Sequence, residues 1–62
     1  MKVKIEVGVD PGNGETEWPA EFRTWANPND VYKALSYLIR FAERVTRTIT
    51  GFRLTNEQEG LE

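Results

Sequence analysis

The 62-residue chain contains neither cysteine nor histidine. Without cysteine it forms no disulfide bonds and no thiolate-ligated zinc site, which rules out a secreted disulfide-stabilised scaffold. Without histidine it lacks the usual general base, the commonest metal ligand and every Ser-His or Cys-His pair. Its one serine, Ser36, falls in the middle of an expected helix with no base nearby in the sequence. We therefore expect a protein that is not an enzyme, with no catalytic residue, no metal site and no cofactor.

Long apolar runs are also missing. None approaches the roughly 20 residues that a membrane-spanning helix requires. The opening residues 1–9 alternate charged and apolar side chains, unlike a signal peptide. We expect a soluble protein, cytoplasmic by default, with no membrane partner.

Methionine occurs only at position 1. A chain without cysteine, histidine or internal methionine resembles many computed sequences, so a designed or redesigned scaffold without biological function is an alternative.

The short chain has room for one domain. A domain of this size buries only about 60% of the surface that its unfolded chain exposes, so its core is thin. We expect residues 1–55 to form a single α+β domain and residues 56–62 to be a disordered polar tail. Leu61 and Glu62, at the end of this tail, also fit a cloning remnant. The formal net charge of −2 gives no general preference for nucleic acid.

The N-terminal half of the chain predicts two strands. Residues 2–9 alternate polar and apolar side chains, which is the pattern of a half-buried strand. Residues 10–14 read Asp-Pro-Gly-Asn-Gly, a strong hairpin-turn signal. A second strand is expected over residues 15–25. Because Pro19 cannot donate a hydrogen bond to a neighbouring strand, we expect this strand to lie at an edge or to contain a bulge.

A helix is predicted to begin at Pro28, where Asn27 can act as the cap and Asp30 occupies the capping-box position. At 100° per residue its apolar side chains span about 220°, against the ≳100° that a surface helix normally buries. This excess points to a partner or a dimer. The side chains concerned are Val31, Tyr32, Ala34, Leu35, Tyr37, Leu38, Ile39, Phe41, Ala42 and Val45.

The end of the helix is ambiguous in the sequence. We expect the helix to reach about Thr46 and a third strand to cover residues 48–55, because β-branched residues favour strands. Residues 46–51 also fit a continued helix, since Ile49 extends the apolar helical stripe. If the strand forms, Gly51 marks a bulge that resets its alternation.

These elements predict an α+β fold in which one helix packs on one face of a three-stranded antiparallel sheet, in β-β-α-β order. This order resembles small phage proteins that inhibit host enzymes and antitoxins of the HicB type, and the resemblance implies a binding role. The predicted core draws apolar residues from every element: Val3, Ile5, Val7, Trp18, Ala20, Phe22, Val31, Leu35, Leu38, Ile39, Ala42, Val45, Phe52 and Leu54.

Exposed aromatic residues beside arginine are typical anchors of protein interfaces. On this basis we predict a partner-binding surface made of Trp25, Tyr37, Arg40, Phe41 and Arg44. The alternative is that Tyr37 and Phe41 cover the edge of the small sheet and belong to the core. The sequence thus favours a small non-catalytic module that binds a protein partner or a second copy of itself as a homodimer, with no evident small-molecule substrate.

Two charged patterns suggest other ligands. A basic helical stripe suits phosphates and makes a nucleic-acid binder the second alternative, although Glu43 and the negative net charge disfavour it. Recognition of single-stranded RNA on the sheet would need outward aromatics, and only Trp25 plainly points that way. The oxygen-rich loop 10–17 does not match a calcium-binding pattern. The stripe consists of Lys33, Arg40, Arg44 and Arg47.

Overall fold

A three-stranded antiparallel sheet organises the structure, a computed structural model that describes residues 2–45 and 47–56. Strand β1 (Val3–Asp10) lies in the centre, between β2 (Arg23–Ala26) and β3 (Thr48–Asn56). Both neighbours run antiparallel to β1. The order β2-β1-β3 makes β2 an edge strand, as the sequence predicts.

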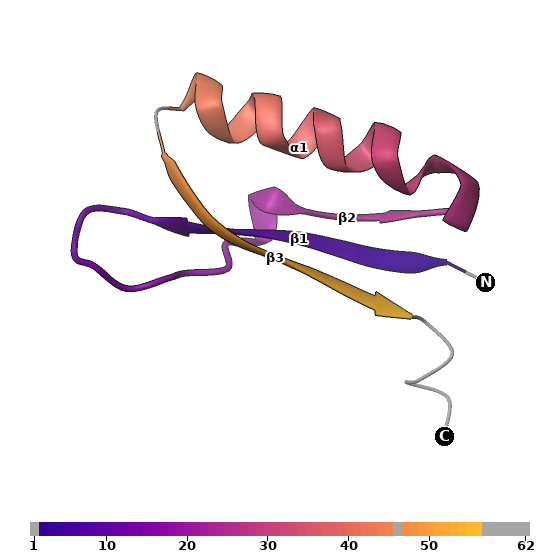
Figure 1. The fold of residues 1–62 in the computed structure, drawn as a ribbon, viewed down its shortest axis with the longest axis horizontal. Coiled ribbons are helices and arrows are strands. Elements are labelled where there is room, and N and C mark those ends of the chain that lie inside the picture. The colour runs from indigo at the N-terminus through magenta and orange to yellow at the C-terminus, as the bar shows by residue number, and fades with distance from the viewer. Residues whose placement is uncertain (1, 46, 57–62) are drawn as a thin grey trace.

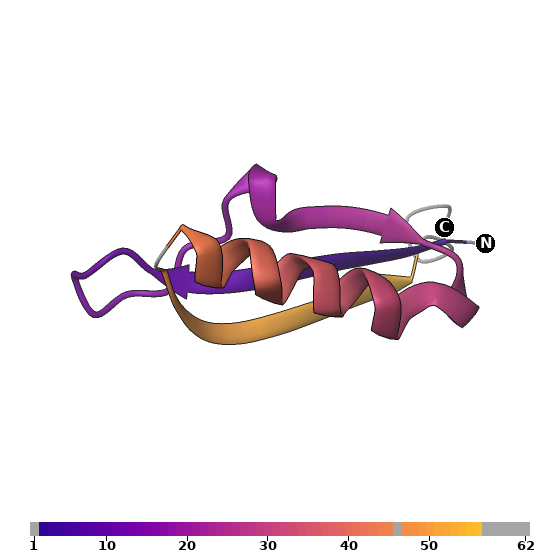
Figure 2. The same cartoon turned by 90° about the horizontal axis from the view of Figure 1, so that it is seen from above.

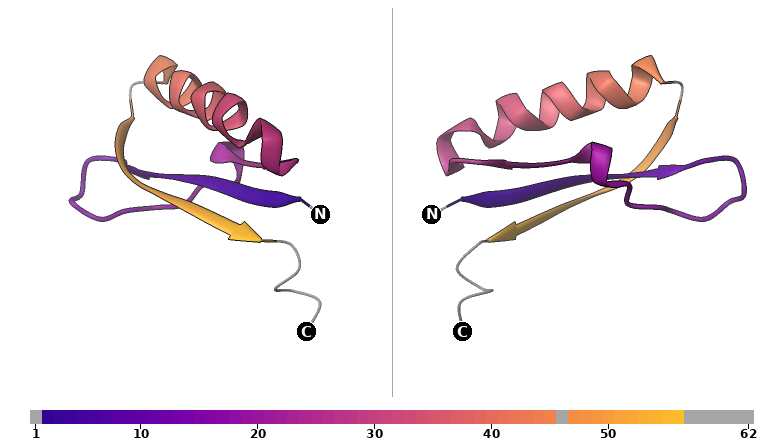
Figure 3. Two further views of the ribbon diagram at one scale, coloured as in Figure 1. Left: turned by 45° about the vertical axis from the view of Figure 1, so that its right-hand side comes forward. Right: turned by 180° about the vertical axis from the view of Figure 1, so that it is seen from behind.

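Helix α1 (Val31–Arg44) packs on one face of this sheet (Figure 1). Seen from above, its C-terminal half lies over β1, between β2 and β3 (Figure 2). The C-terminal half of β3 turns away from the helix (Figure 3). The predicted α+β class and β-β-α-β order are confirmed. Within the described residues no helix is long and apolar enough to cross a membrane.

The second strand is shorter than predicted, because the chain makes a 3₁₀ turn at Ala20–Phe22 and only Arg23–Ala26 form β2. The turn follows Pro19, whose ring fixes φ and removes a backbone donor. The N–H of Phe22 donates to the Pro19 carbonyl oxygen at 3.1 Å. The turn breaks the expected alternation, so Phe22 enters the core whereas Trp18 lies on the other face of the sheet.

Helix α1 is also shorter than predicted. The helical backbone begins at Pro28 with Asn27 in the N-cap position, as predicted, but Pro28–Asp30 form a 3₁₀ turn and α1 itself starts at Val31. The side chains of Asn27 and Asp30 make no capping hydrogen bond, so that part of the prediction is wrong. The Asp30 N–H instead donates to the Asn27 carbonyl oxygen at 2.8 Å. At its other end the helix stops short of Thr46, which lies outside the described residues, and the chain is a strand from Thr48 onward.

The pairing of β3 with β1 contains the predicted bulge. Gly8 lies opposite Gly51, and the residue after Gly8 lies opposite Ile49, which leaves Thr50 as the extra residue. The bulge resets the alternation of side chains, so Ile49 and Phe52 share the face that α1 covers. The last residue of β3 is position 56, and positions 57–62 of the predicted tail lie outside the described residues.

The predicted core is too large. Phe52 and Leu54 face the helix side of the sheet but are 50% and 57% exposed, because β3 turns away from α1. Ala20 and Val45 are exposed as well, since the first lies in a surface turn and the second lies just past the end of the helix. The buried residues are Ile5, Val7, Val9, Phe22, Leu38 and Ala42. Val3, Val31, Ala34 and Leu35 are among those that pack partly buried around them.

Candidate functional site

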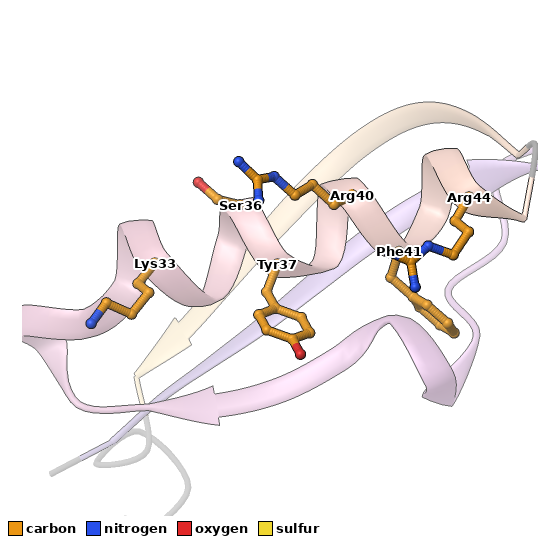
Figure 4. A pocket seen from close by; sticks show the side chains of 6 residues that line it. All are labelled: Lys33, Ser36, Tyr37, Arg40, Phe41 and Arg44. Carbon is orange, nitrogen blue, oxygen red and sulfur yellow. The ribbon is translucent and has the colours of Figure 1, made fainter.

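Four of the five predicted binding residues lie together on α1. Tyr37, Arg40, Phe41 and Arg44 line one shallow pocket along the helix, together with Lys33 and Ser36 (Figure 4). Positions 33, 37, 40, 41 and 44 are spaced by three and four residues, which brings their side chains onto one side of a helix. We call Lys33, Tyr37, Arg40, Phe41 and Arg44 the basic-aromatic surface.

The two aromatic rings of this surface differ in burial. Phe41 is 37% exposed, and its ring meets the buried ring of Phe22 edge-on, with centroids 5.3 Å apart and planes at 74°. This geometry is favourable for an aromatic pair and attaches Phe41 to the core. Tyr37 is 78% exposed. The alternative of a core role therefore applies to Phe41, whereas Tyr37 is an exposed aromatic.

The cations of the basic-aromatic surface outnumber the carboxylates beside them on α1, where Glu43 lies three residues after Arg40. Both ion pairs found among residues 2–45 and 47–56 involve Glu6, on the far side of the sheet. Within those ranges Lys33, Arg40 and Arg44 form none. Clustered cations of this kind create a positive potential that attracts anionic groups and raises their association rate.

Trp25 does not join this surface. It lies opposite Lys4 in the pairing of β1 with β2, on the face of the sheet that points away from α1. The Lys4 Nζ atom is 5.9 Å from the centroid of the Trp25 ring, within the range of a cation–π contact. The five residues predicted as one surface thus occupy two faces of the molecule.

The face of the sheet that carries Trp25 also holds a charge cluster that the sequence reasoning missed. Glu6 is only 5% exposed. The Nε–H of Arg23 donates to its Oε2 atom at 3.0 Å, and Nη2 of Arg53 lies 3.5 Å from its Oε1 atom. The two guanidinium groups compensate the cost of burying this carboxylate. The strand register is the signal that reveals this cluster, because it places both arginines directly opposite Glu6.

Trp18 packs against the paired glycines of β1 and β3. A Cβ atom added at Gly8 would lie 2.7 Å from Cγ2 of Thr16 and 2.9 Å from Cη2 of Trp18. A Cβ atom at Gly51 would lie 3.5 Å from the same indole atom. The Arg53 guanidinium stands 3.9 Å from the Trp18 ring centroid. With its edge against glycine and a face under Arg53, this indole is a poor stacking platform for a nucleotide base.

The acidic loop after β1 is held by hydrogen bonds to the carboxylate of Asp10. Asp10 Oδ1 accepts backbone N–H groups from Gly12, Asn13 and Gly14 at 2.7, 3.0 and 3.1 Å. These hydrogen bonds, that from Gly12 first, hold the pKa of Asp10 below its ordinary value of 3.8. Across the described part of the chain, no group of three or more His, Cys, Asp or Glu side chains is arranged to hold a metal ion.

Comparisons with known proteins add no relative. No protein-family model, no curated protein and no solved structure matches this chain. The likeness to phage inhibitors and HicB-type antitoxins therefore rests on element order alone, which is weak ground for a function. Any function has to be argued from the surfaces described above.

Proposed function

We propose that the protein is a non-catalytic protein-interaction module that binds an acidic segment of a partner through the basic-aromatic surface of α1. One observation carries this proposal: the exposed ring of Tyr37 lies among Lys33, Arg40 and Arg44, which have no carboxylate partner in the described ranges. Tyrosine and arginine are the residue types that most often dominate binding energy at interfaces.

The helix presents these side chains in a pre-organised form. Phe41 is held by its contact with Phe22, so little conformational freedom is lost there on binding. Tyr37 supplies a large apolar ring with a hydroxyl group that suits a half-wet interface. The cations add steering and orientation, which favours a partner segment that combines carboxylates with apolar side chains.

Nucleic acid is the second class of anionic partner. It is less favoured because base stacking needs open aromatic faces, and Trp18 has a face covered by Arg53. Tyr37 is the one strongly exposed ring among the described residues of the basic-aromatic surface. The test below therefore includes an oligonucleotide as a competing outcome.

Fluorescence anisotropy with defined probes tests the proposal. The first probe is a labelled amphipathic peptide of glutamate and leucine. The second is the same peptide with lysine in place of glutamate, and the third is a labelled single-stranded oligothymidine. Each is titrated at low salt and at about 0.15 M salt, where exposed charges are screened beyond about 8 Å. We expect saturable binding of the glutamate peptide and none of the lysine peptide.

Two variants locate the binding. Tyr37→Ala and Arg40→Glu should each weaken binding of the glutamate peptide about tenfold, equivalent to about 1.4 kcal/mol. Arg47→Glu is the matched control, because it makes the same change of charge at an exposed residue outside the pocket lining. Equal losses for Arg40→Glu and Arg47→Glu, or tighter binding of oligothymidine than of the peptide, would overturn the proposal.

A further inference from the structure

A second apolar surface lies along β3. Phe52 and Leu54 lie opposite the buried Val7 and Ile5 in the strand pairing, yet half or more of each side chain is exposed. We call Phe52 and Leu54 the β3 patch.

The backbone beside this patch is open as well. β3 is an edge strand of nine residues, and one side of it faces no other strand of the described chain. Proteins normally protect such edges with proline, charge or a covering segment. β3 contains no proline, and its single charged residue, Arg53, lies on the opposite face with Glu6 and Trp18. The bulge at Thr50 disturbs only the first half of the strand.

We propose that a second copy of this chain covers the β3 patch, with the two β3 strands paired antiparallel about a two-fold axis. Such a contact is isologous, because the same strand and the same patch serve on both copies. It joins the two sheets into one and brings Phe52 and Leu54 of both copies together on the helix side. The patch itself carries no charge that would select an acidic or a basic partner.

The apolar patch supplies one part of the contact area. Aromatic side chains present about 150–250 Å² each, so half-exposed Phe52 together with Leu54 offers roughly 200 Å² per copy and roughly 400 Å² for a pair. The backbone and the remaining side chains of the two paired edge strands would supply the rest of the ~1,000 Å² expected of a specific interface.

Charge and the bulge together select a register. Pairing Arg53 with Arg53 of the partner subunit would place two cations directly opposite each other, which destabilises a sheet. A two-fold axis at Leu54 avoids this, because Arg53 then lies opposite the partner's Thr55. It also confines the pairing to positions 52–56, clear of the bulge at Thr50.

Sedimentation velocity of the full chain over a range of concentrations tests the dimer. We expect the mass of two copies for the wild type. Leu54→Asp should weaken the dimer at least about hundredfold, because it buries a charge at the two-fold axis. Tyr37→Asp, on the other flank of α1, is the matched control and should remain dimeric. Leu54 is 57% exposed, so Leu54→Asp should keep its helix and sheet, which far-UV circular dichroism checks.

Because the chain contains no cysteine, a single introduced cysteine gives a second test of the dimer. A single Leu54→Cys substitution should form a disulfide between the two copies on mild oxidation, since the two Cβ atoms would lie about 4.5–5.5 Å apart and a small shift of the paired strands brings them into the range of about 3.5–4.5 Å that a disulfide requires. Tyr37→Cys should not cross-link at the same concentration. A chain that stays monomeric at every concentration, or cross-linking that is equal at both positions, overturns the proposal. The dimer does not rest on the basic-aromatic surface, and Leu54→Asp should bind the glutamate peptide as the wild type does.

Discussion

Alanine at Gly8 tests how closely side chains pack over the centre of the sheet. The new Cβ atom would meet Cγ2 of Thr16 at 2.7 Å and two atoms of the Trp18 ring at 2.9 and 3.0 Å. All three distances are at or below the closest separation that carbon atoms tolerate. Trp18 cannot yield easily, because Arg53 lies 3.9 Å from its ring centroid and Gly51 lies against its edge.

The magnitude follows from two opposing effects. Overpacking by one methyl group in a well-packed site costs about 1–3 kcal/mol. Replacing glycine by alanine in a strand also restricts the unfolded chain, which stabilises by about 0.4–1 kcal/mol. We therefore expect Gly8→Ala to lower the free energy of unfolding by about 1–2 kcal/mol. For a domain of this size that is a fall in Tm of about 5–15 °C. Urea denaturation followed by circular dichroism measures the free energy directly.

Two further substitutions make the test specific. Gly51→Ala is the matched control, because its Cβ atom would sit 3.5 Å from Trp18, an ordinary contact, and it should be neutral or slightly stabilising. Thr16→Ser removes the methyl group that lies closest to Gly8 and should recover part of the loss in a double variant. If Gly8→Ala were as stable as Gly51→Ala, the proposed close packing of Trp18 over Gly8 would be wrong.

Three other substitutions address the core, the charge cluster and the loop. Leu38→Ala should cost about 2–5 kcal/mol in urea denaturation, since Leu38 is buried in the core, and a loss of a few tenths would contradict that assignment. Glu6→Gln should cost about 1–2 kcal/mol, because Arg23 and Arg53 lose their shared anion, and an unchanged urea midpoint would argue against the cluster. Because the pKa of Asp10 is lowered on folding, its carboxylate stabilises the folded state above about pH 4, and this contribution is lost as the pH falls through the folded value. Asp10→Asn should therefore melt below the wild type at pH 7 and converge with it in acid, whereas a constant difference in Tm would refute the linkage.

Local patterns in the sequence were enough to predict the order of the helix and strands along the chain. Alternation identified β1, and Gly51 marked the bulge in β3. The 3₁₀ turn after Pro19 was not foreseen, because a proline in an apparent strand signals a disruption without saying which shape replaces it. That turn decides which face receives Trp18. An alternation of period two cannot predict which face of the sheet a side chain occupies on the other side of such an interruption.

The surfaces were only partly predictable, for a related reason. Helical periodicity placed Tyr37, Arg40 and Arg44 on one side of α1, where the structure has them. Periodicity gives the direction of a side chain but not how far a neighbouring element extends over it. The pattern therefore predicts Phe52 in the core, although β3 turns away from α1 and half of this side chain stays exposed. Glu6 was missed because the pairing of β1 with both neighbours has to be known before its two arginine partners can be named.

The placement of the tryptophans has a consequence for following unfolding by spectroscopy. Trp18 and Trp25 both lie on the side of the sheet away from α1, so neither indole reports on the helix-facing core. Intrinsic fluorescence therefore records the state of the strands, while ellipticity at 222 nm records mainly the helix. Melting curves that coincide by both signals would identify the helix and the sheet as one cooperative unit. A fluorescence change that came later would mean that the strands outlast the helix.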